Sequence, residues 1–436
     1  MKRIAVVSGA AVVLLAGAGI PVYMGYQAQS ALSAAHRYQH ADLEIVHEIR
    51  RYRNGYANSS ADAIITVSKG GESIQLAASH NIEHLWLPRI ETSYRLLPEG
   101  SEFQKSLHAA VGDEPVLFTD ARQTFDGLIV ALNMPAREGV LEGEQGRFRF
   151  DGMTGAATTV GDRLSGKLQF NPLRIDGEDE GKFELGTQQV RFDIENTRDL
   201  LSPGSFAYNL DRVNLRARDE RFDLNRVQIE QTQTASGASV NGDVSIEIGS
   251  IETSTGSLSD LSIRINVGSL HRDLLEFLFQ ASRSTADDTD AATAAREDIT
   301  PLVARFLAHS PEANLRVALG RDANTQGTVN WSLAYRHSPE TPVDPVVLEN
   351  LLGGVDSKAV ATFKQSAIEA LLRLSGGDIA SSDDITATLA EWEAEGLLAR
   401  DGDDYRLTLA FSDGMVLVNE VPRPELLLML GMMLAL

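Results

Sequence analysis

Cysteine is absent from the 436-residue chain, and positive charge is scarce. Without a thiol, the protein cannot use cysteine catalysis, cysteine-ligated zinc, iron–sulfur clusters or disulfide bonds. The 39 Lys and Arg residues stand against 61 Asp and Glu residues, which gives a net charge of −22. Because binding to a phosphate backbone needs clustered positive charge, this balance argues against a nucleic-acid partner.

In other respects the composition is that of a folded protein. Hydrophobic residues make up 43% of the chain and charged residues 23%, which is too ordinary a mixture for general disorder. A chain of this length can bury a large core and predicts two or three domains.

The N-terminal end has the pattern of a membrane anchor. Lys2 and Arg3 precede an apolar and small-residue run, Ile4 to Met24, whose 21 residues would form a helix of ~30 Å, the thickness of a bilayer core. The alternative is a cleavable signal peptide with Ala16-Gly17-Ala18 as the cleavage pattern, but the apolar run continues past that point. We expect an uncleaved single-pass anchor within residues 1–29, with a cytoplasmic N-terminus and an exported body.

The next region, residues 30–268, is expected to hold an exported helix and an antiparallel β-rich part. Gln27 to Arg51 is rich in Ala, Leu, Glu and Arg and predicts the helix. After it, a recurring unit of glycine followed by x-apolar-x-apolar predicts strands with one apolar face, each entered through a turn glycine. The unit begins at Gly146, Gly166, Gly181 and Gly242. Its uneven spacing indicates a meander of hairpins rather than a solenoid.

Residues 269–310 predict a helical segment that contains a mobile loop. Helical periodicity covers His271 to Ser282 and returns near Thr300 to His309. Between them, Thr285 to Ala295 is acidic and rich in small residues, which is typical of a loop.

Residues 311–436 predict strands, amphipathic helices and an apolar C-terminal tail. Apolar positions from Val360 to Leu372 have helical spacing, a second helix is expected through Trp392, and Tyr405 to Val418 predicts a hairpin. The tail, Leu426 to Leu436, would be ~16 Å long as a helix, too short to cross a bilayer. We favour its packing on the apolar side of the sheet over contact with the membrane.

Several short motifs resemble the YdgA-like family, bacterial proteins anchored in the inner membrane whose periplasmic domain has no established function. The motifs are Tyr52 to Ser60, the pair His84 and Pro88, Ser310-Pro311, Gly396 to Leu398, and the closing hairpin with Tyr405, Gly414 and Leu417 to Asn419. The resemblance implies a periplasmic location and marks Gly55, Tyr56, Ser59, Tyr405, Gly414 and Asn419 as motif residues with structural roles. It supplies no catalytic residue.

The patterns that could carry chemistry are incomplete. Gly161 to Lys167 fits the first seven positions of a phosphate-binding P-loop, but Leu168 stands where a hydroxyl must hold magnesium, and the flanks predict strands. The chain contains neither a Gly-x-Ser-x-Gly elbow nor a His-Glu-x-x-His motif. We therefore predict no catalytic and no cofactor-binding residue.

Two sets of histidines have the i, i+4 spacing that can share a metal ion. The first is His36 and His40, with His47 on the same predicted helix face, and the second is His80 and His84. His47 would lie ~10 Å beyond His40 along a helix, too far for a common ion. We interpret these residues as solvated polar positions and predict no metal site.

The predicted fold is α+β but β-dominated: a single N-terminal transmembrane helix, then a long, curved, mostly antiparallel meander sheet with a few packing helices. The predicted protein is anchored in the bacterial inner membrane through residues 4–24 and is non-enzymatic. We expect it to hold lipid or an exported client on an apolar sheet face. The alternative is an envelope scaffold or protein-interaction module with a closed core, and an envelope hydrolase is less favoured.

Overall fold

The computed structural model describes residues 36–423, except for gaps at 41–42, 54–57, 71, 84–87, 142–145, 178–180, 200, 219, 284–300, 321–325, 337–353, 375–381 and 413. The predicted anchor (4–24), the acidic loop (285–295) and the apolar tail (426–436) lie outside the described residues. Among the helices that are described, none is both long and apolar enough to cross a membrane.

The chain divides into two compact units. Unit 1 is formed within residues 1–197 and 210–219, and unit 2 within residues 198–209 and 220–436. The boundary passes through the long strand β15 (Gly204–Ala217).

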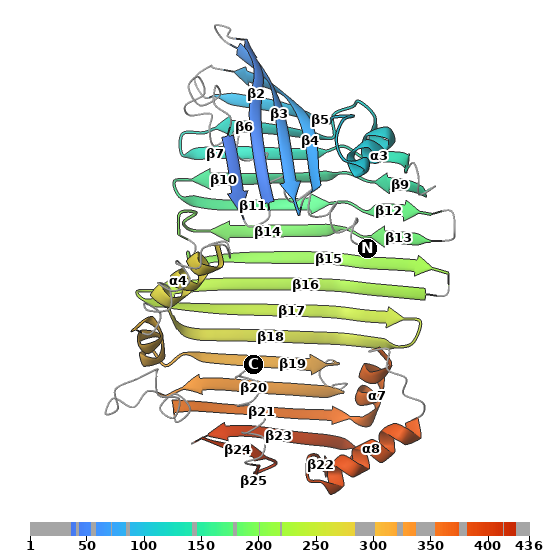
Figure 1. The fold of residues 1–436 in the computed structure, drawn as a ribbon, viewed down its shortest axis with the longest axis vertical. Helices are drawn as coiled ribbons and strands as arrows, with labels where there is room; N and C mark the ends of the chain where they lie inside the picture. Colours follow the sequence, from blue (N-terminus) through green and yellow to red (C-terminus); the bar gives the residue numbers. More distant parts are fainter. Residues whose placement is uncertain are drawn as a thin grey trace. The chain divides into compact units, whose positions relative to one another are not determined.

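Unit 1 consists of antiparallel strands that pair mostly with their neighbours in the sequence (Figure 1). Strands β1 to β7 pair in chain order. The strands are β1 (His36–His40), β2 (Leu43–Arg53), β3 (Asn58–Lys69), β4 (Glu72–Glu83), β5 (Arg89–Leu96), β6 (Leu117–Gln123), β7 (Gly127–Met134), β8 (Arg137–Leu141), β9 (Gly146–Phe150), β10 (Met153–Val160), β11 (Arg163–Phe170), β12 (Leu173–Asp176), β13 (Lys182–Leu185) and β14 (Gln188–Ile194).

From β7 onward, extended segments of unit 1 are interrupted by two-residue breaks that lie beside one another. The breaks are Pro135-Ala136, Asp151-Gly152, Asn171-Pro172 and Gly186-Thr187. Proline has no N–H to donate, so it interrupts a ladder, and the neighbouring breaks are joined by hydrogen bonds from Asn171 N to Gly152 O (2.9 Å) and from Asp151 N to Pro172 O (3.0 Å). As a result, two ladders run side by side, β7–β10–β11–β14 and β8–β9–β12–β13–β15.

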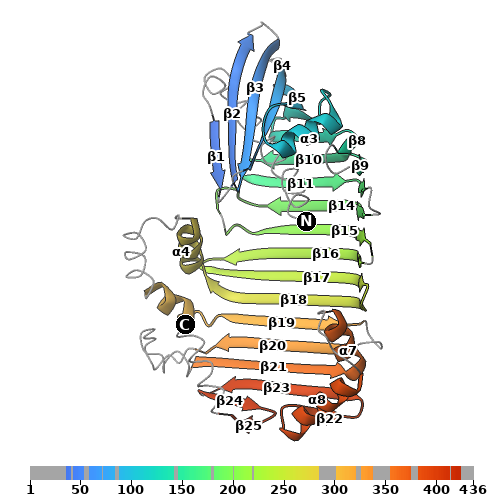
Figure 2. The ribbon, with the colours of Figure 1, turned by 45° about the vertical axis from the view of Figure 1, so that its right-hand side comes forward.

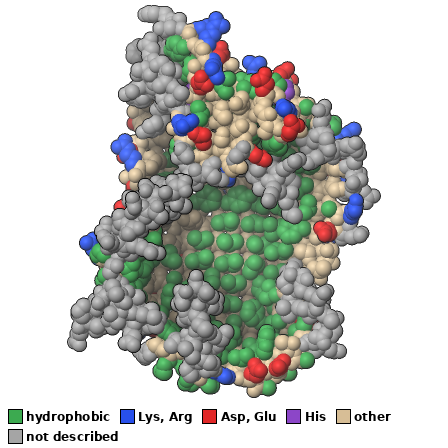
Figure 3. All heavy atoms as spheres, in the orientation of Figure 1, with side chains coloured by type: hydrophobic (Ala, Val, Ile, Leu, Met, Phe, Trp, Pro, Cys, Tyr) green, Lys and Arg blue, Asp and Glu red, His purple; other side chains and the backbone are tan. Residues whose placement is uncertain are grey.

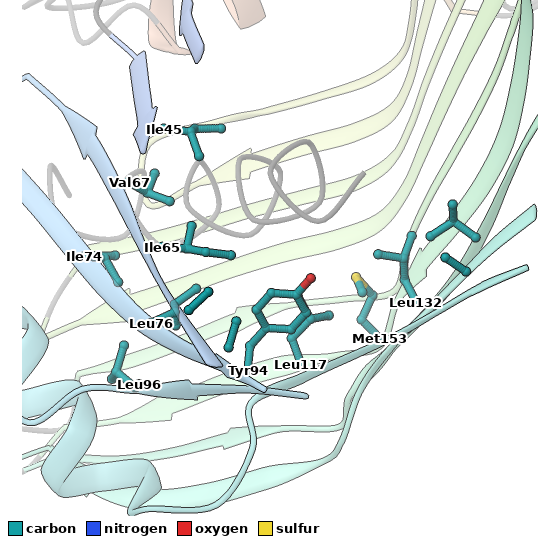
Figure 4. Close-up of a cluster of buried hydrophobic side chains, with 14 of the residues drawn as sticks. Ile45, Ile65, Val67, Ile74, Leu76, Tyr94, Leu96, Leu117, Leu132 and Met153 are labelled. Carbon is teal, nitrogen blue, oxygen red and sulfur yellow. The ribbon is translucent and has the colours of Figure 1, made fainter. Parts of the chain in front are cut away.

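The core of unit 1 is closed between two parts of its sheet (Figure 4). Every second residue of β3 and β4 is buried, as a strand with one inward face requires. Their side chains pack in one cluster with Tyr94 and Leu117 and with Met153 and Leu168 of the later strands. Helix α3 (Glu102–Val111) is fixed at its start by the fully buried Gln104, whose side-chain amide bonds the backbone of β4. Unit 1 therefore has a conventional, water-excluding interior.

Unit 2 is an antiparallel meander with helices at the ends of its strands (Figures 1 and 2). From β16 the strands pair in chain order, except that β23 lies between β21 and the two short strands β22 and β24. The elements are β16 (Glu220–Ser236), β17 (Ser239–Thr253), β18 (Ser257–His271), α4 (Arg272–Arg283), a helical stretch at 301–308, β19 (Glu312–Leu319), β20 (Gly327–Tyr335), β21 (Val355–Lys364), α7 (Gln365–Leu374), α8 (Ser382–Ala394), β22 (Ala399–Asp401), β23 (Asp404–Ser412), β24 (Met415–Val418) and β25 (Val421–Pro422).

The structure confirms the β-dominated antiparallel fold with few helices, but it corrects the helix expected at Gln27 to Arg51. Of this segment, the described residues from His36 form strands β1 and β2. Alternate residues Ile45, His47 and Ile49 point into the core of unit 1, so the period of two decides the structure over the helical propensity of single residues.

Two further expectations were partly wrong. Val360 and Phe363 belong to strand β21, because this segment pairs with strands on both sides, and the helix begins only at Gln365. Gly166 and Gly242 are not turn residues but lie inside β11 and β17. The helix through Trp392 and the hairpin from Tyr405 to Val418 are confirmed.

Candidate functional site

Strands β16 to β23 of unit 2 alternate between apolar and polar residues. In β18, for example, Ile263 and Ile265 are separated by Arg264, and in β19 Leu315 and Val317 are separated by Arg316. Because successive side chains point to opposite faces of a sheet, this alternation separates one apolar face from one polar face.

The register places the apolar residues in rows across the strands. Leu315 pairs with Ile265 on one side and with Trp331 on the other, and the same alignment continues in both directions. We call the following three rows the apolar face. They are Val244, Ile265, Leu315, Trp331, Ala359, Leu409 and Val418; Ile229, Ile246, Ile263, Val317, Val329, Ala361 and Leu407; and Val227, Ile248, Leu261, Leu319, Gly327, Phe363 and Tyr405.

The apolar face is only half buried, in contrast to the closed core of unit 1. Ile265 is 37% exposed and Leu409 38% exposed, and most other members have intermediate exposure. The buried members are Val227, Leu319, Gly327, Tyr405 and Val418. Figure 3 shows the same region, over β16 to β21, as a hollow with a floor of hydrophobic side chains. Within the described part of unit 2, fully buried clusters are small: one around Leu258, Leu319 and Ala367, and one around Tyr405.

Helices flank the two ends of the strands that form the apolar face. At one end, α4 begins directly after β18, where Arg272 Nη1 bonds Asp199 Oδ2 at 2.8 Å. This guanidinium lowers the pKa of the Asp199 carboxyl through its hydrogen bond. At the other end, α7 follows β21 and packs the fully buried Ala367 against Leu319.

Near one end of this face, two residues with positive φ and a glycine form a line across three neighbouring strands. Arg226 and Asp260 both have positive φ, 53° each, and Gly249 lies between them in β17. A Cβ atom at Gly249 would approach Arg226 Nε to 2.6 Å, so the Arg226 side chain packs closely over this glycine. At this line the apolar residues of β17 shift from one set of alternate positions to the other. Ile248 and Ile251 are three residues apart, and each pairs with a leucine of β18. This keeps the face apolar on both sides of the line.

Of the six residues that the family resemblance marked, Tyr405 belongs to the apolar face. Gly55 and Tyr56 fall outside the described residues. Ser59 is buried in β3 of unit 1, and Tyr405 is buried in β23, with the Arg400 guanidinium 5.8 Å from its ring centroid. Gly414, with φ of 73°, makes the β23–β24 turn.

Asn419 holds the end of the closing hairpin together. Its Oδ1 accepts from Thr408 N at 2.8 Å, and its Nδ2 donates to the carbonyls of Gly396 and Leu397, each at 3.0 Å. The φ of Asn419 is 48°, a region that asparagine tolerates better than most residues. Its role is structural.

The structure corrects the interpretation as solvated for two of these histidines. His47 and His80 are buried in unit 1, with ring centroids 5.6 Å apart. His80 Nδ1 is 2.8 Å from Thr92 Oγ1. Burial, and then the nearby His47, lower the pKa of His80 from 6.5 to about 4. Among the described residues, no group of three or more metal-ligating side chains is found; His84 lies outside them.

The P-loop-like segment is a hairpin. Gly161, with φ of 59°, turns between β10 and β11, whose residues pair from Val160 and Arg163 onward. No helix follows, so the helix N-terminus that would bind phosphate is missing at this place. The incomplete motif is therefore an ordinary strand connection.

Sequence alternation could have identified the apolar face, but only together with the register. Each strand shows its own apolar side, whereas the rows depend on pairing between segments far apart, such as Trp331 with Ala359. The sequence also gave no signal for which apolar face would be closed and which would stay open.

Comparisons with known proteins address the family. A family described as bacterial protein of unknown function (DUF945) matches residues 1–425. Searches of curated proteins and of solved structures found no match. Since the match covers nearly the whole chain, the protein belongs to this bacterial family of unknown function.

Proposed function

We propose that the protein is a non-enzymatic lipid-binding protein of the cell envelope, which holds an acyl chain on the apolar face of unit 2. One observation carries the proposal: rows of apolar residues cross the strands from β16 to β23, and most of their side chains remain partly exposed. Soluble proteins rarely leave such a large apolar surface without a ligand or partner.

The length of the rows fits an elongated apolar ligand. Seven strands contribute to each row, and six spacings of ~4.8 Å amount to ~29 Å. A lipid chain occupies half of the ~30 Å bilayer core, or ~15 Å, so it can be covered along its whole length. A globular partner would need no such continuous strip across the strands.

The face of the sheet opposite the apolar face is polar, which supports its exposure to water. Residues that alternate with the apolar rows include Arg264, Arg316 and Asn330, which are exposed and lie side by side across β18 to β20. The sheet is thus amphipathic, with a wet side and a side that needs cover.

A photoreactive residue in the floor of the hollow tests the acyl-chain assignment. Ile265 would be replaced by p-benzoylphenylalanine in the full chain, cells would be irradiated, and the denatured protein would be weighed by mass spectrometry. We expect the added mass of a lipid. The matched control is the same replacement at Arg264, the next residue on the polar face, which should gain none. A protein-sized adduct at position 265, or no adduct, would contradict lipid binding; the former would favour an exported client or partner.

We also propose that the family resemblance is to YdgA-like proteins and that residues 4–24 anchor the chain in the inner membrane with the body in the periplasm. The support is the sequence: Lys2 and Arg3 ahead of an uninterrupted apolar run. Since the chain has no cysteine, a single introduced Ser332→Cys on the polar face gives a clean probe. In intact spheroplasts a membrane-impermeant maleimide should label this residue; labelling only after lysis would place the body in the cytoplasm.

A further inference from the structure

The apolar face has a candidate occupant within the chain itself. Residues 426–436 (LLLMLGMMLAL) contain no polar or charged side chain, in a protein whose net charge is −22. An uncharged apolar run of this kind is driven out of water and must find cover. The run also lies beyond the family match, which ends at residue 425, so family membership assigns it no role.

The last described residues lie at the edge of the apolar face, close to the start of this run. Strand β25 pairs with β24, where Val418 belongs to the apolar face. Arg423 N donates to Val416 O at 2.9 Å, and Arg423 Nη2 donates to Glu395 O at 2.8 Å, so the chain is fixed at this edge. The apolar run starts three residues further on, within ~10 Å.

The run is long enough to follow a row of the apolar face. Eleven residues reach ~36 Å when extended and ~16 Å as a helix, against ~29 Å for a row. The short connection to Arg423 gives the run an effective concentration in the millimolar range at this surface. A membrane surface is a poorer site, because the acidic body is repelled by anionic headgroups.

We propose that residues 426–436 dock on the apolar face of unit 2 and are displaced when an acyl chain binds there. The tail would cover the face in the unloaded protein and would set a threshold for loading, since a ligand must compete with a tethered segment. The acyl chain that displaces the tail is taken from the proposed function, so the competition rests on that function. Docking of the tail on the apolar face does not depend on it.

Disulfide formation tests the docking, because in this cysteine-free chain only the two introduced thiols can pair within one molecule. Leu428→Cys, Leu430→Cys and Met433→Cys would each be combined with Leu315→Cys in the full chain. The matched control pairs each with Arg316→Cys, the next residue of β19 on the opposite face. Membranes would be oxidised with copper phenanthroline, and linked tryptic peptides quantified. We expect at least one tail position to link to residue 315 about tenfold more than to residue 316.

Equal yields with residues 315 and 316, or no link from any of the three tail positions, would overturn the docking. Three positions are used so that a different register of the tail does not mimic a failure. Adding palmitate should lower the link to residue 315 and leave the background at residue 316 unchanged.

Photoreactive palmitate then separates this proposal from the proposed function. The full chain would be compared with a chain ending at Arg423 and with the full-length variant Leu428→Asp/Leu430→Asp. Both variants should take up severalfold more label. Strong but equal labelling of all three proteins would refute the competition and leave lipid binding standing. A disulfide to residue 315 without labelling of any protein would refute the acyl chain and leave the docked tail standing.

Discussion

His47 and His80 lie edge to face inside unit 1, with their ring centroids 5.6 Å apart and both side chains at most 4% exposed. His80 bonds Thr92 through Nδ1, and no hydrogen-bond partner for its Nε2 is found among the described residues. A second proton on His80 would therefore be buried, unsolvated and close to another imidazole, while the charge of Asp62 offsets only part of this cost.

This arrangement predicts that unit 1 loses stability in mild acid. The pKa of His80 is lowered from 6.5 to about 4, so between these values the unfolded chain binds a proton that the folded chain does not. The free energy of unfolding has its full value above pH 6.5 and falls by ~1.4 kcal/mol per pH unit below it. The total loss near pH 4 is ~3 kcal/mol.

Urea unfolding of the full chain between pH 7 and 4 measures this loss. His80→Asn cannot titrate and should remove this part of the pH dependence, whereas His309→Asn, an exposed histidine of unit 2, should keep it. Equal slopes for the wild type and His80→Asn would show that His80 does not carry the effect.

Asn419→Ala should weaken the closing hairpin of unit 2. The substitution removes one acceptor and two donor contacts that satisfy Thr408 N and the carbonyls of Gly396 and Leu397, and it places alanine at φ of 48°. Together these losses should cost ~2–4 kcal/mol in the free energy of unfolding, measured in urea. Asn330→Ala, an exposed asparagine on the polar face, is the control and should stay within ~0.5 kcal/mol of wild type. Equal losses would contradict the role of the Asn419 contacts.

The strand pattern was predictable because it is local. Alternation in a strand such as β19 and a turn glycine such as Gly414 report on a few adjacent residues, and the structure follows both. The helix expected up to Arg51 failed because single-residue propensities favour a helix there, while Ile45 and Ile49 are held in the unit 1 core by strands that are remote in sequence.

The glycine unit shows a second limit of local patterns. Gly146 and Gly181 stand at or next to the start of a strand as expected, whereas Gly166 lies mid-strand because the Phe192 ring of β14 covers it. The reason for this glycine is a partner 26 positions away in the chain, so no local pattern could reveal it. The apolar face depended in the same way on a register between distant strands.

Gly166→Ala therefore makes a direct test of this contact. A Cβ atom at residue 166 would come within 2.4 Å of Phe192 Cζ, so the ring must move or the strands must separate. We expect a loss of ~1–3 kcal/mol in the free energy of unfolding. In the double variant with Phe192→Leu, the smaller side chain should recover part of the loss. Additive effects of the two substitutions would mean that the ring and the glycine do not interact.

A charge on the apolar face should weaken lipid binding without unfolding the protein. Ile265 is 37% exposed, so the sheet itself leaves the carboxylate of Ile265→Asp in contact with water, but a bound acyl chain would have to cover it. Labelling of the full chain by photoreactive palmitate should drop at least ~10-fold, which corresponds to ~1.4 kcal/mol of binding free energy. Arg264→Asp introduces the same side chain one residue away on the polar face and should label like wild type. Ile265→Asp adds one negative charge to an already acidic protein, and Arg264→Asp also removes a positive one. A general electrostatic effect would therefore lower the labelling of Arg264→Asp at least as much, and only a contact with the apolar face makes Ile265→Asp the weaker binder.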